Sequence, residues 1–102
     1  MMPLFAFYCR DGEHGAKLRE RLLADHLAHV EAHLDDYAVA GPLKKGDDTI
    51  GSLLVIKAAD EDEARAKFEV DPYFHAGVWQ SISASAFMGV AGEWVGGAAW
   101  KR

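Results

Sequence analysis

The stretch TIGSLLVIKA, residues 49–58, is the longest strand-like run in this sequence and decides how the rest of the chain can fold. Apolar and β-branched residues dominate it, which is typical of a strand. Because successive side chains point to opposite faces of a strand, Leu54 and Ile56 share one face. Leu53 and Val55 share the other. Both faces are apolar, which predicts that the strand is buried on both sides of its sheet.

The segments on either side of this strand alternate between strand and helix patterns. The second helix is expected to begin after Asp60, with Glu63 three residues later as in a capping box, and to end before Asp71-Pro72. In chain order the expected elements are a strand at 3–9, a helix from about 13 to 36, strands at 37–43 and 49–58, a helix up to about 70 and a strand at 78–88.

This β-α-β-β-α-β order predicts the α+β class with a ferredoxin-like fold. Such a fold has one four-stranded antiparallel sheet with two helices on one face. The strand at 3–9 is also apolar on both faces, and two helices cover only one of them. We therefore expect a homodimer that packs through the open sheet face. Alternatively, the C-terminal tail folds back over that face.

The composition of the chain limits the kinds of partner that it can bind. The chain has 102 residues, which suits a single domain, and its formal net charge is −5. An acidic chain is unsuited to nucleic acid or an anionic membrane surface, and no apolar run is long enough to span a bilayer. The single cysteine, Cys9, fits a reducing, cytoplasmic location, and its place in a strand suggests an inert buried thiol. We expect domain 1–90 to be followed by a tail at 91–102, which contains Trp94 and Trp100.

Three histidines follow one another along the first helix. At about 100° per residue, His26 falls inside the apolar stripe, His33 at its edge and His29 toward solvent. Their spacing is compatible with metal ligands, but no clear third ligand completes a set, so no metal is expected. A histidine and an arginine on the buried side, His26 and Arg19, each need hydrogen-bond partners. A backbone carbonyl or a carboxylate would serve for His26, and spacing alone does not choose among the aspartates.

Several motifs resemble the YciI-like family, which is related to dimeric α+β barrel enzymes such as muconolactone isomerases. They are HLAHV at 26–30 after Arg19, AGPL at 40–43 and GSLLVIKAADEDEARAKFEVDPYFHAGVW at 51–79. The resemblance covers residues 4 to about 88 and implies a dimeric α+β barrel. It also implies a histidine–aspartate active-site pair, which falls on His26 and Asp71. Many members carry an arginine three residues before the histidine, where this chain has Leu23.

The resemblance implies a lyase or isomerase that uses His26 as a general base oriented by Asp71, without metal or organic cofactor. A characterised relative eliminates hydrogen chloride from a chlorinated hydroxyquinol-type ring. Arg19, Ser52 and Tyr8 are candidates to bind an anionic or phenolic oxygen of a small cyclic or aromatic substrate, although each also has a structural explanation. Two alternatives remain open: a non-catalytic module that binds a small molecule in the same cavity, and a plain dimerisation domain.

Overall fold

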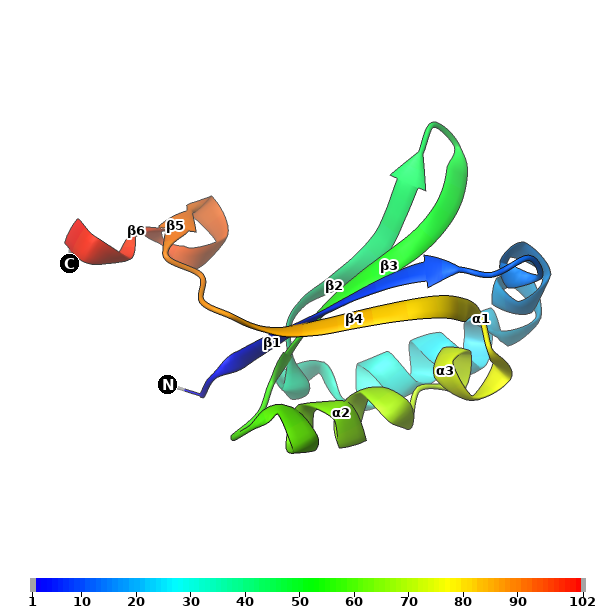
Figure 1. The fold of residues 1–102 in the computed structure, drawn as a ribbon, viewed down its shortest axis with the longest axis horizontal. Helices are drawn as coiled ribbons and strands as arrows, with labels where there is room; N and C mark the ends of the chain where they lie inside the picture. Colours follow the sequence, from blue (N-terminus) through cyan, green and yellow to red (C-terminus); the bar gives the residue numbers. More distant parts are fainter. Residues whose placement is uncertain (1, 102) are drawn as a thin grey trace.

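The computed structural model describes residues 2–101 and has the predicted fold, a four-stranded antiparallel sheet covered by helices on one face (Figure 1). The sheet and helices follow one another as β1 Leu4–Asp11, α1 Gly15–Ala32, β2 Tyr37–Lys45, β3 Asp48–Lys57, α2 Glu61–Glu69, α3 Pro72–Ala76 and β4 Trp79–Phe87. A 3₁₀ turn, Leu34–Asp36, links α1 to β2. The predicted strands lie within two residues of the observed ones at each end.

The strand order in the sheet is β2-β3-β1-β4, so the first strand of the chain lies in the middle. Phe7 of β1 is opposite Leu54 of β3 on one side and Ala84 of β4 on the other. Residues directly opposite each other in antiparallel strands project to the same face. This register therefore assembles a continuous apolar surface toward the helices.

The core lies between that surface and the short helices. The ring of Phe68 from α2 stacks on Phe7 at a centroid distance of 4.4 Å and on Trp79 at 5.3 Å. Phe7, Phe68 and Cys9 are all fully or almost fully buried. These contacts hold α2 against the centre of the sheet, and they fix the position of α3, which follows directly.

A second, short helix, α3, follows α2, and it was not predicted. Asp60 caps α2 as expected, since its carboxylate accepts a hydrogen bond from the Glu63 backbone N–H at 2.8 Å. The Asp71-Pro72 pair ends that helix, but it also begins α3, with Asp71 as N-cap and Pro72 at the first turn. Both residue types are favoured at these positions, so the pair acts as a stop and as a start.

The first helix is oriented differently from the helical-wheel prediction. Its packed side is formed by Leu18 and Leu22, which contact the core, and by His26. Leu23 and Leu27 are half exposed, although they recur at the three- and four-residue spacing that defines the expected buried stripe. They overhang a cavity beside the sheet, so the apolar stripe is wider than the packed face.

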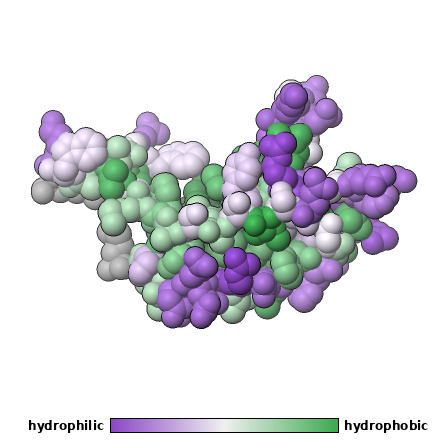
Figure 2. Space-filling model, in the orientation of Figure 1, coloured by the Kyte–Doolittle hydropathy of each residue, from purple (hydrophilic) through white to green (hydrophobic). Residues whose placement is uncertain are grey.

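The other face of the sheet carries no helix among the described residues (Figure 1). Figure 2 shows hydrophobic residues over the sheet between the C-terminal segment and the tip of the β2–β3 hairpin. Hydrophilic residues gather at that tip and along the helices. Within residues 2–101, no helix has the length and apolar character needed to cross a membrane.

The chain continues past β4 as a small separate hairpin, the C-terminal segment (residues 88–101). Its strands β5, Ala91–Gly92, and β6, Gly97–Ala98, pair with each other and not with the main sheet. Short 3₁₀ turns, Glu93–Val95 and Ala99–Lys101, complete it. The segment does not fold back over the open sheet face, so the alternative cover considered from the sequence is not observed (Figure 1).

Candidate active site

His26 and Asp71 come together across the gap between α1 and α3. Nδ1 of His26 lies 2.9 Å from Oδ1 of Asp71, and Asp71 is completely buried. The same oxygen accepts a hydrogen bond from the Tyr73 backbone N–H at 2.8 Å. The cap of α3 therefore holds the carboxylate in place before any ligand binds. A carboxylate on Nδ1 fixes the proton there and leaves the lone pair on Nε2.

Tyr73 holds the imidazole from its face. The two rings stack at a centroid distance of 3.8 Å with an interplanar angle of 4°. The Tyr73 hydroxyl donates to the backbone carbonyl of Arg19 at 3.2 Å, which ties α3 to α1. Burial raises the pKa of this hydroxyl, and Arg19 partly offsets that rise, so the phenol remains a neutral donor at ordinary pH. The plane of the His26 ring is consequently set by packing as well as by Asp71.

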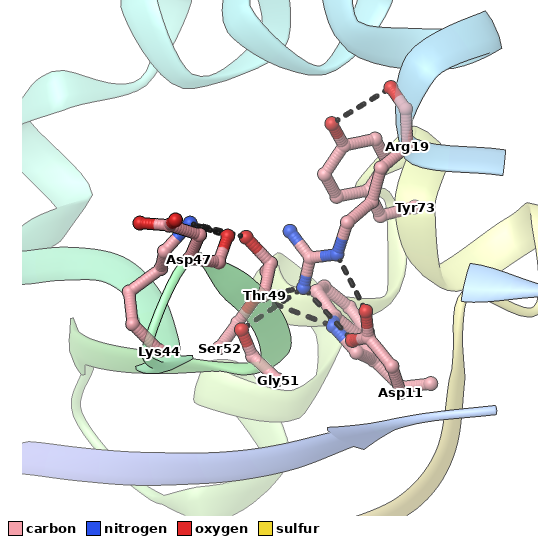
Figure 3. A network of polar contacts seen from close by, with 9 residues as sticks. Asp11, Arg19, Lys44, Asp47, Thr49, Gly51, Ser52 and Tyr73 are labelled. Atoms are coloured by element: carbon pink, nitrogen blue, oxygen red, sulfur yellow. Dashed lines mark hydrogen bonds and ion pairs between the residues drawn. The ribbon is translucent and has the colours of Figure 1, made fainter. Parts of the chain in front are cut away.

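Arg19 is the centre of a polar network (Figure 3). Its side chain borders the same cavity as His26. Its Nε and Nη2 contact the two carboxylate oxygens of Asp11 at 2.7 and 2.9 Å. Nη2 also donates to Ser52 Oγ at 2.8 Å and to the Gly51 carbonyl at 3.0 Å. The guanidinium lies over the Tyr73 ring, 5.3 Å from its centroid. Asp11 neutralises the charge of Arg19, while Nη1 has no partner within residues 2–101 and is free to donate.

His26, Tyr73 and Arg19 line one cavity of about 320 Å³ between α1 and the β2–β3 half of the sheet. Its walls include Leu23, His26 and Leu27 from α1, and Pro42, Ser52 and Leu54 from the sheet. The lining is mostly apolar, with a few polar groups placed together, which is the usual composition of a small-molecule site. His26 is 17% exposed by side chain, and its Nε2 has no hydrogen-bond partner in the described part of the chain.

Ser52 has the expected location but an additional partner. It is buried, and its Oγ accepts a hydrogen bond from the indole N–H of Trp79 at 3.3 Å as well as one from Arg19. A hydroxyl that accepts two hydrogen bonds still has its own proton to donate. Ser52 can therefore offer an O–H to an oxygen atom in the cavity.

Tyr8 requires a correction. It is paired with Leu53 of β3 and alternates with the core residues Phe7 and Cys9, so its side chain projects from the opposite face of the sheet. The side chain is 45% exposed and is contacted by Arg10 at 3.4 Å. The expected contact between Tyr8 and a substrate beside His26 is wrong, because the sheet separates the two.

The remaining histidines do not form a metal centre. His14 and His75 are exposed, as expected, and no three His, Cys, Asp or Glu side chains converge on a common point anywhere in residues 2–101. His33 is exposed, and its Nδ1 contacts the His29 carbonyl at 2.7 Å. His29 was expected to face solvent, but it is half buried with its Nε2 enclosed.

Asp71 influences two other buried groups. Burial, and then the negative charge of Asp71, raise the pKa of Cys9 to about 12. Burial and then Asp71 likewise raise the pKa of Tyr37 to about 12. Cys9 therefore remains a protonated thiol and is not a nucleophile.

Sequence reasoning missed two residues that organise this site, Tyr73 and Asp11. Tyr73 follows Asp71-Pro72 by one position, which places its backbone N–H at the second turn position of a capped helix. That spacing was visible, but the stacking on His26 depends on how α3 crosses α1. Asp11 lies beyond the strand expected at 3–9, whereas β1 extends through it and presents its carboxylate to Arg19.

Comparisons with known proteins give a family and a similar solved structure. The YCII-related domain matches residues 3–87. A solved structure of the 5-chloro-2-hydroxyhydroquinone dehydrochlorinase from Burkholderia phenoliruptrix, in complex with 2,5-dihydroxybenzoquinone, is similar with a TM-score of 0.75. The sequences are 27% identical, and the similarity covers 88% of this chain and 96% of that one. A search of curated proteins gave no match.

Proposed function

This chain belongs to the YCII-related domain family, and on that premise we propose that it is a cofactor-independent lyase or isomerase acting on a small cyclic or aromatic substrate. The observation that carries the proposal is the 2.9 Å contact between His26 and a completely buried Asp71 beside the 320 Å³ cavity. The similarity to a dehydrochlorinase supports a lyase-type reaction and a hydroxyquinol-like ring.

His26 is the proposed general base. Asp71 accepts the hydrogen bond from Nδ1–H, so the lone pair is on Nε2 of a side chain that lines the cavity. In an elimination, Nε2 removes a proton from a ring hydroxyl or from a carbon next to a carbonyl. The substrate reacts as its keto tautomer, in which the halogen-bearing carbon is tetrahedral. The electron pair released moves into the ring as a new double bond, and the halide leaves that carbon with the electrons of its carbon–halogen bond. The products are an unsaturated ring, halide and the imidazolium, so no oxidant is needed.

In an isomerisation, the same imidazolium would return its proton to another atom of the ring. Asp71 stabilises the imidazolium in either case, because it already bonds the other nitrogen. Arg19 and Ser52 are the proposed oxygen-binding groups, through Nη1 and Oγ–H respectively. Both are held by other side chains, so they are oriented before the substrate arrives.

The test is chloride release from 5-chloro-2-hydroxyhydroquinone, the compound named for the similar dehydrochlorinase. We expect turnover by the wild-type protein and a loss of about 10²–10⁴-fold in His26→Asn, the range typical of removing a general base. His75→Asn is the matched control, because His75 is exposed on the helix that carries the dyad's aspartate at its cap. Equal rates in both variants would exclude His26 as the base.

A non-catalytic binding module is the second candidate. The observation that favours it is that Asp11, Ser52 and the Gly51 carbonyl already engage two of the three guanidinium nitrogens of Arg19. Binding of 2,5-dihydroxybenzoquinone without chloride release from any chlorinated hydroxyquinol would favour this function. Absence of both binding and turnover would leave only the dimerisation domain.

We also propose that the protein is a homodimer joined through the open sheet face. Apolar residues such as Leu4, Val39 and Leu53 lie on this face at only intermediate exposure, and Phe87 is half exposed at its edge. A serine row on β4, Ser81, Ser83 and Ser85, borders them. A second copy would cover the apolar centre and leave the serines near the edge.

A further inference from the structure

Two buried polar atoms near the dyad have no hydrogen-bond partner within residues 2–101. They are Oδ2 of Asp71 and Nε2 of His29. Leaving a buried polar atom unpaired is costly, more so for a charged oxygen, and such pairs of atoms are commonly joined by an internal water. The proposed mechanism uses Oδ1 of Asp71 and does not involve either of these atoms.

The two atoms belong to groups that act on each other. His29 follows His26 by three residues, so both project from the same side of α1. Burial lowers the pKa of His29, and the Asp71 carboxylate is the strongest influence that raises it. The effect of Asp71 on this pKa is larger than the opposing effect of His33, whose ring centroid is only 4.5 Å away. It is also larger than the opposing effect of His26. Asp36 also raises the pKa of His29, but it ranks last.

His29 borders a second cavity, distinct from the one beside His26. This cavity is about 280 Å³ and lies between α1, α2 and the start of β2. Tyr37 and Lys67 also border it, and Lys67 is held there by ion pairs to Asp36 at 3.0 Å and Glu63 at 3.4 Å. Asp71 thus contacts one imidazole, His26, and acts electrostatically on a second, His29, and these two imidazoles border different cavities.

We propose that His29 donates a hydrogen bond from Nε2–H, through one bridging water, to Oδ2 of Asp71, and so acts as a positioning residue for the dyad. Oδ1 is occupied by His26 and the Tyr73 backbone N–H, so a partner on Oδ2 prevents rotation of the carboxylate. Tyr37 borders the same cavity as His29, and the charge of Asp71 raises the pKa of its hydroxyl. This hydroxyl is therefore a suitable third partner for the water.

His29 is suited to this role because burial lowers its pKa and so favours the neutral imidazole. A protonated His29 would place a cation beside Asp71 and compete with the imidazolium that forms on His26. A neutral His29 supplies a donor without that competition. The effect on catalysis rests on the proposed function, but the hydrogen bond itself does not.

The first test is ¹⁵N NMR of the imidazoles in the full-length protein. We expect His29 to carry its proton on Nε2, with an N–H signal that exchanges slowly compared with that of exposed His75. A proton on Nδ1, or exchange as rapid as that of His75, would overturn the proposal. This measurement needs no substrate and no variant.

The second test compares Asp71→Asn with Asp36→Asn, since both carboxylates raise the pKa of His29. We expect Asp71→Asn to lower that pKa further, and Asp36→Asn to lower it less, because Asp71 is the stronger of the two raising influences. Equal shifts would overturn the bridge. In the substrate assay, His29→Phe should lower kcat about tenfold at unchanged KM, while His29→Gln, which keeps a donor, should recover most of it. Absence of turnover in the wild type would refute the proposed function and leave the NMR result intact.

Discussion

The carboxylate of Asp71 has a structural task that is separable from its proposed catalytic one. It caps α3, and it is the partner of an imidazole in a fully buried position. Asp60 caps α2 through an equivalent bond but is exposed. The loss of stability caused by removing the Asp60 cap can therefore be subtracted from the loss caused by removing Asp71.

We predict that Asp71→Ala lowers the free energy of unfolding by about 2–4 kcal/mol, because it leaves the Tyr73 N–H and His26 without partners. Asp60→Ala should cost about 1 kcal/mol, the value of an exposed cap. Asp71→Asn keeps an acceptor for the cap and should lie close to Asp60→Ala. Urea unfolding measures all three, and similar losses for both alanine variants would contradict the importance assigned to the buried contact.

Cys9 and Tyr37 should make the fold sensitive to alkali. Burial raises their pKa values to about 12 from 9.0 and 10.0, so each group stays protonated in the folded chain after it has ionised in the unfolded one. The unfolded state then binds fewer protons, and the free energy of unfolding falls as the pH rises. The stabilising contribution is complete below pH 9.0 and is progressively lost toward about 12.

Urea unfolding at a series of alkaline pH values checks this prediction. In Cys9→Ala the decline between pH 9.0 and about 12 should be shallower, because one of the two groups is absent. The absolute stability of that variant will also be lower, since it opens a space in the core, so the slope with pH is the quantity to compare. An unchanged slope would show that Cys9 ionises equally in both states.

At the scale of the elements, local sequence signals predicted nearly everything that depends on periodicity and capping. The strand at 49–58 and the Asp60 cap are within one residue of the structure, and Asp71-Pro72 correctly marks the end of α2. The short helix α3 was missed because it has only five residues, Pro72–Ala76, too few to show a periodic pattern. It is stabilised by its caps and its packing, which periodicity does not detect.

The candidate site was also predicted only in part, because periodicity does not show how the elements pack against one another. The family resemblance selected His26 and Asp71, and periodicity placed His26 on the packed side of α1. Periodicity could not show that His29 is also enclosed, because the wheel assumed that Leu23 and Leu27 pack in the core. It also could not choose between the faces for Tyr8, since both faces of β1 are apolar.

The end of α3 provides a prediction at this scale. Gly77 has a φ of 78°, the left-handed conformation of a helix C-cap, and an added Cβ would meet nothing within 4 Å. Gly41 is equally unobstructed, but it lies in β2 without a positive φ. Gly77→Ala should therefore cost about 1 kcal/mol of stability, while Gly41→Ala should be neutral or stabilising. Thermal unfolding distinguishes them, and equal effects would show that conformation at Gly77 is not the cause.

At the scale of the whole molecule, the open sheet face predicts that the protein in solution has the mass of a dimer. Light scattering coupled to gel filtration should give twice the 11.2 kDa of one chain. Leu53→Glu places a charge at the centre of the proposed interface and should reduce the mass to that of one chain. Leu34→Glu is the control, because Leu34 is an exposed apolar residue on the helical side. Identical masses for both variants would place the interface elsewhere or exclude it.

The C-terminal segment also gives this protein an optical signal. Trp94 and Trp100 are 84% and 70% exposed, whereas Trp79 is buried in the core. Indole fluorescence shifts to shorter wavelength when water is removed from the ring. Two of the three tryptophans therefore emit as hydrated indoles in the single chain, and any partner that packs against the segment would shift the emission maximum toward the blue. A dilution series followed by fluorescence alone would then report whether the segment takes part in assembly, without a label and without changing a residue.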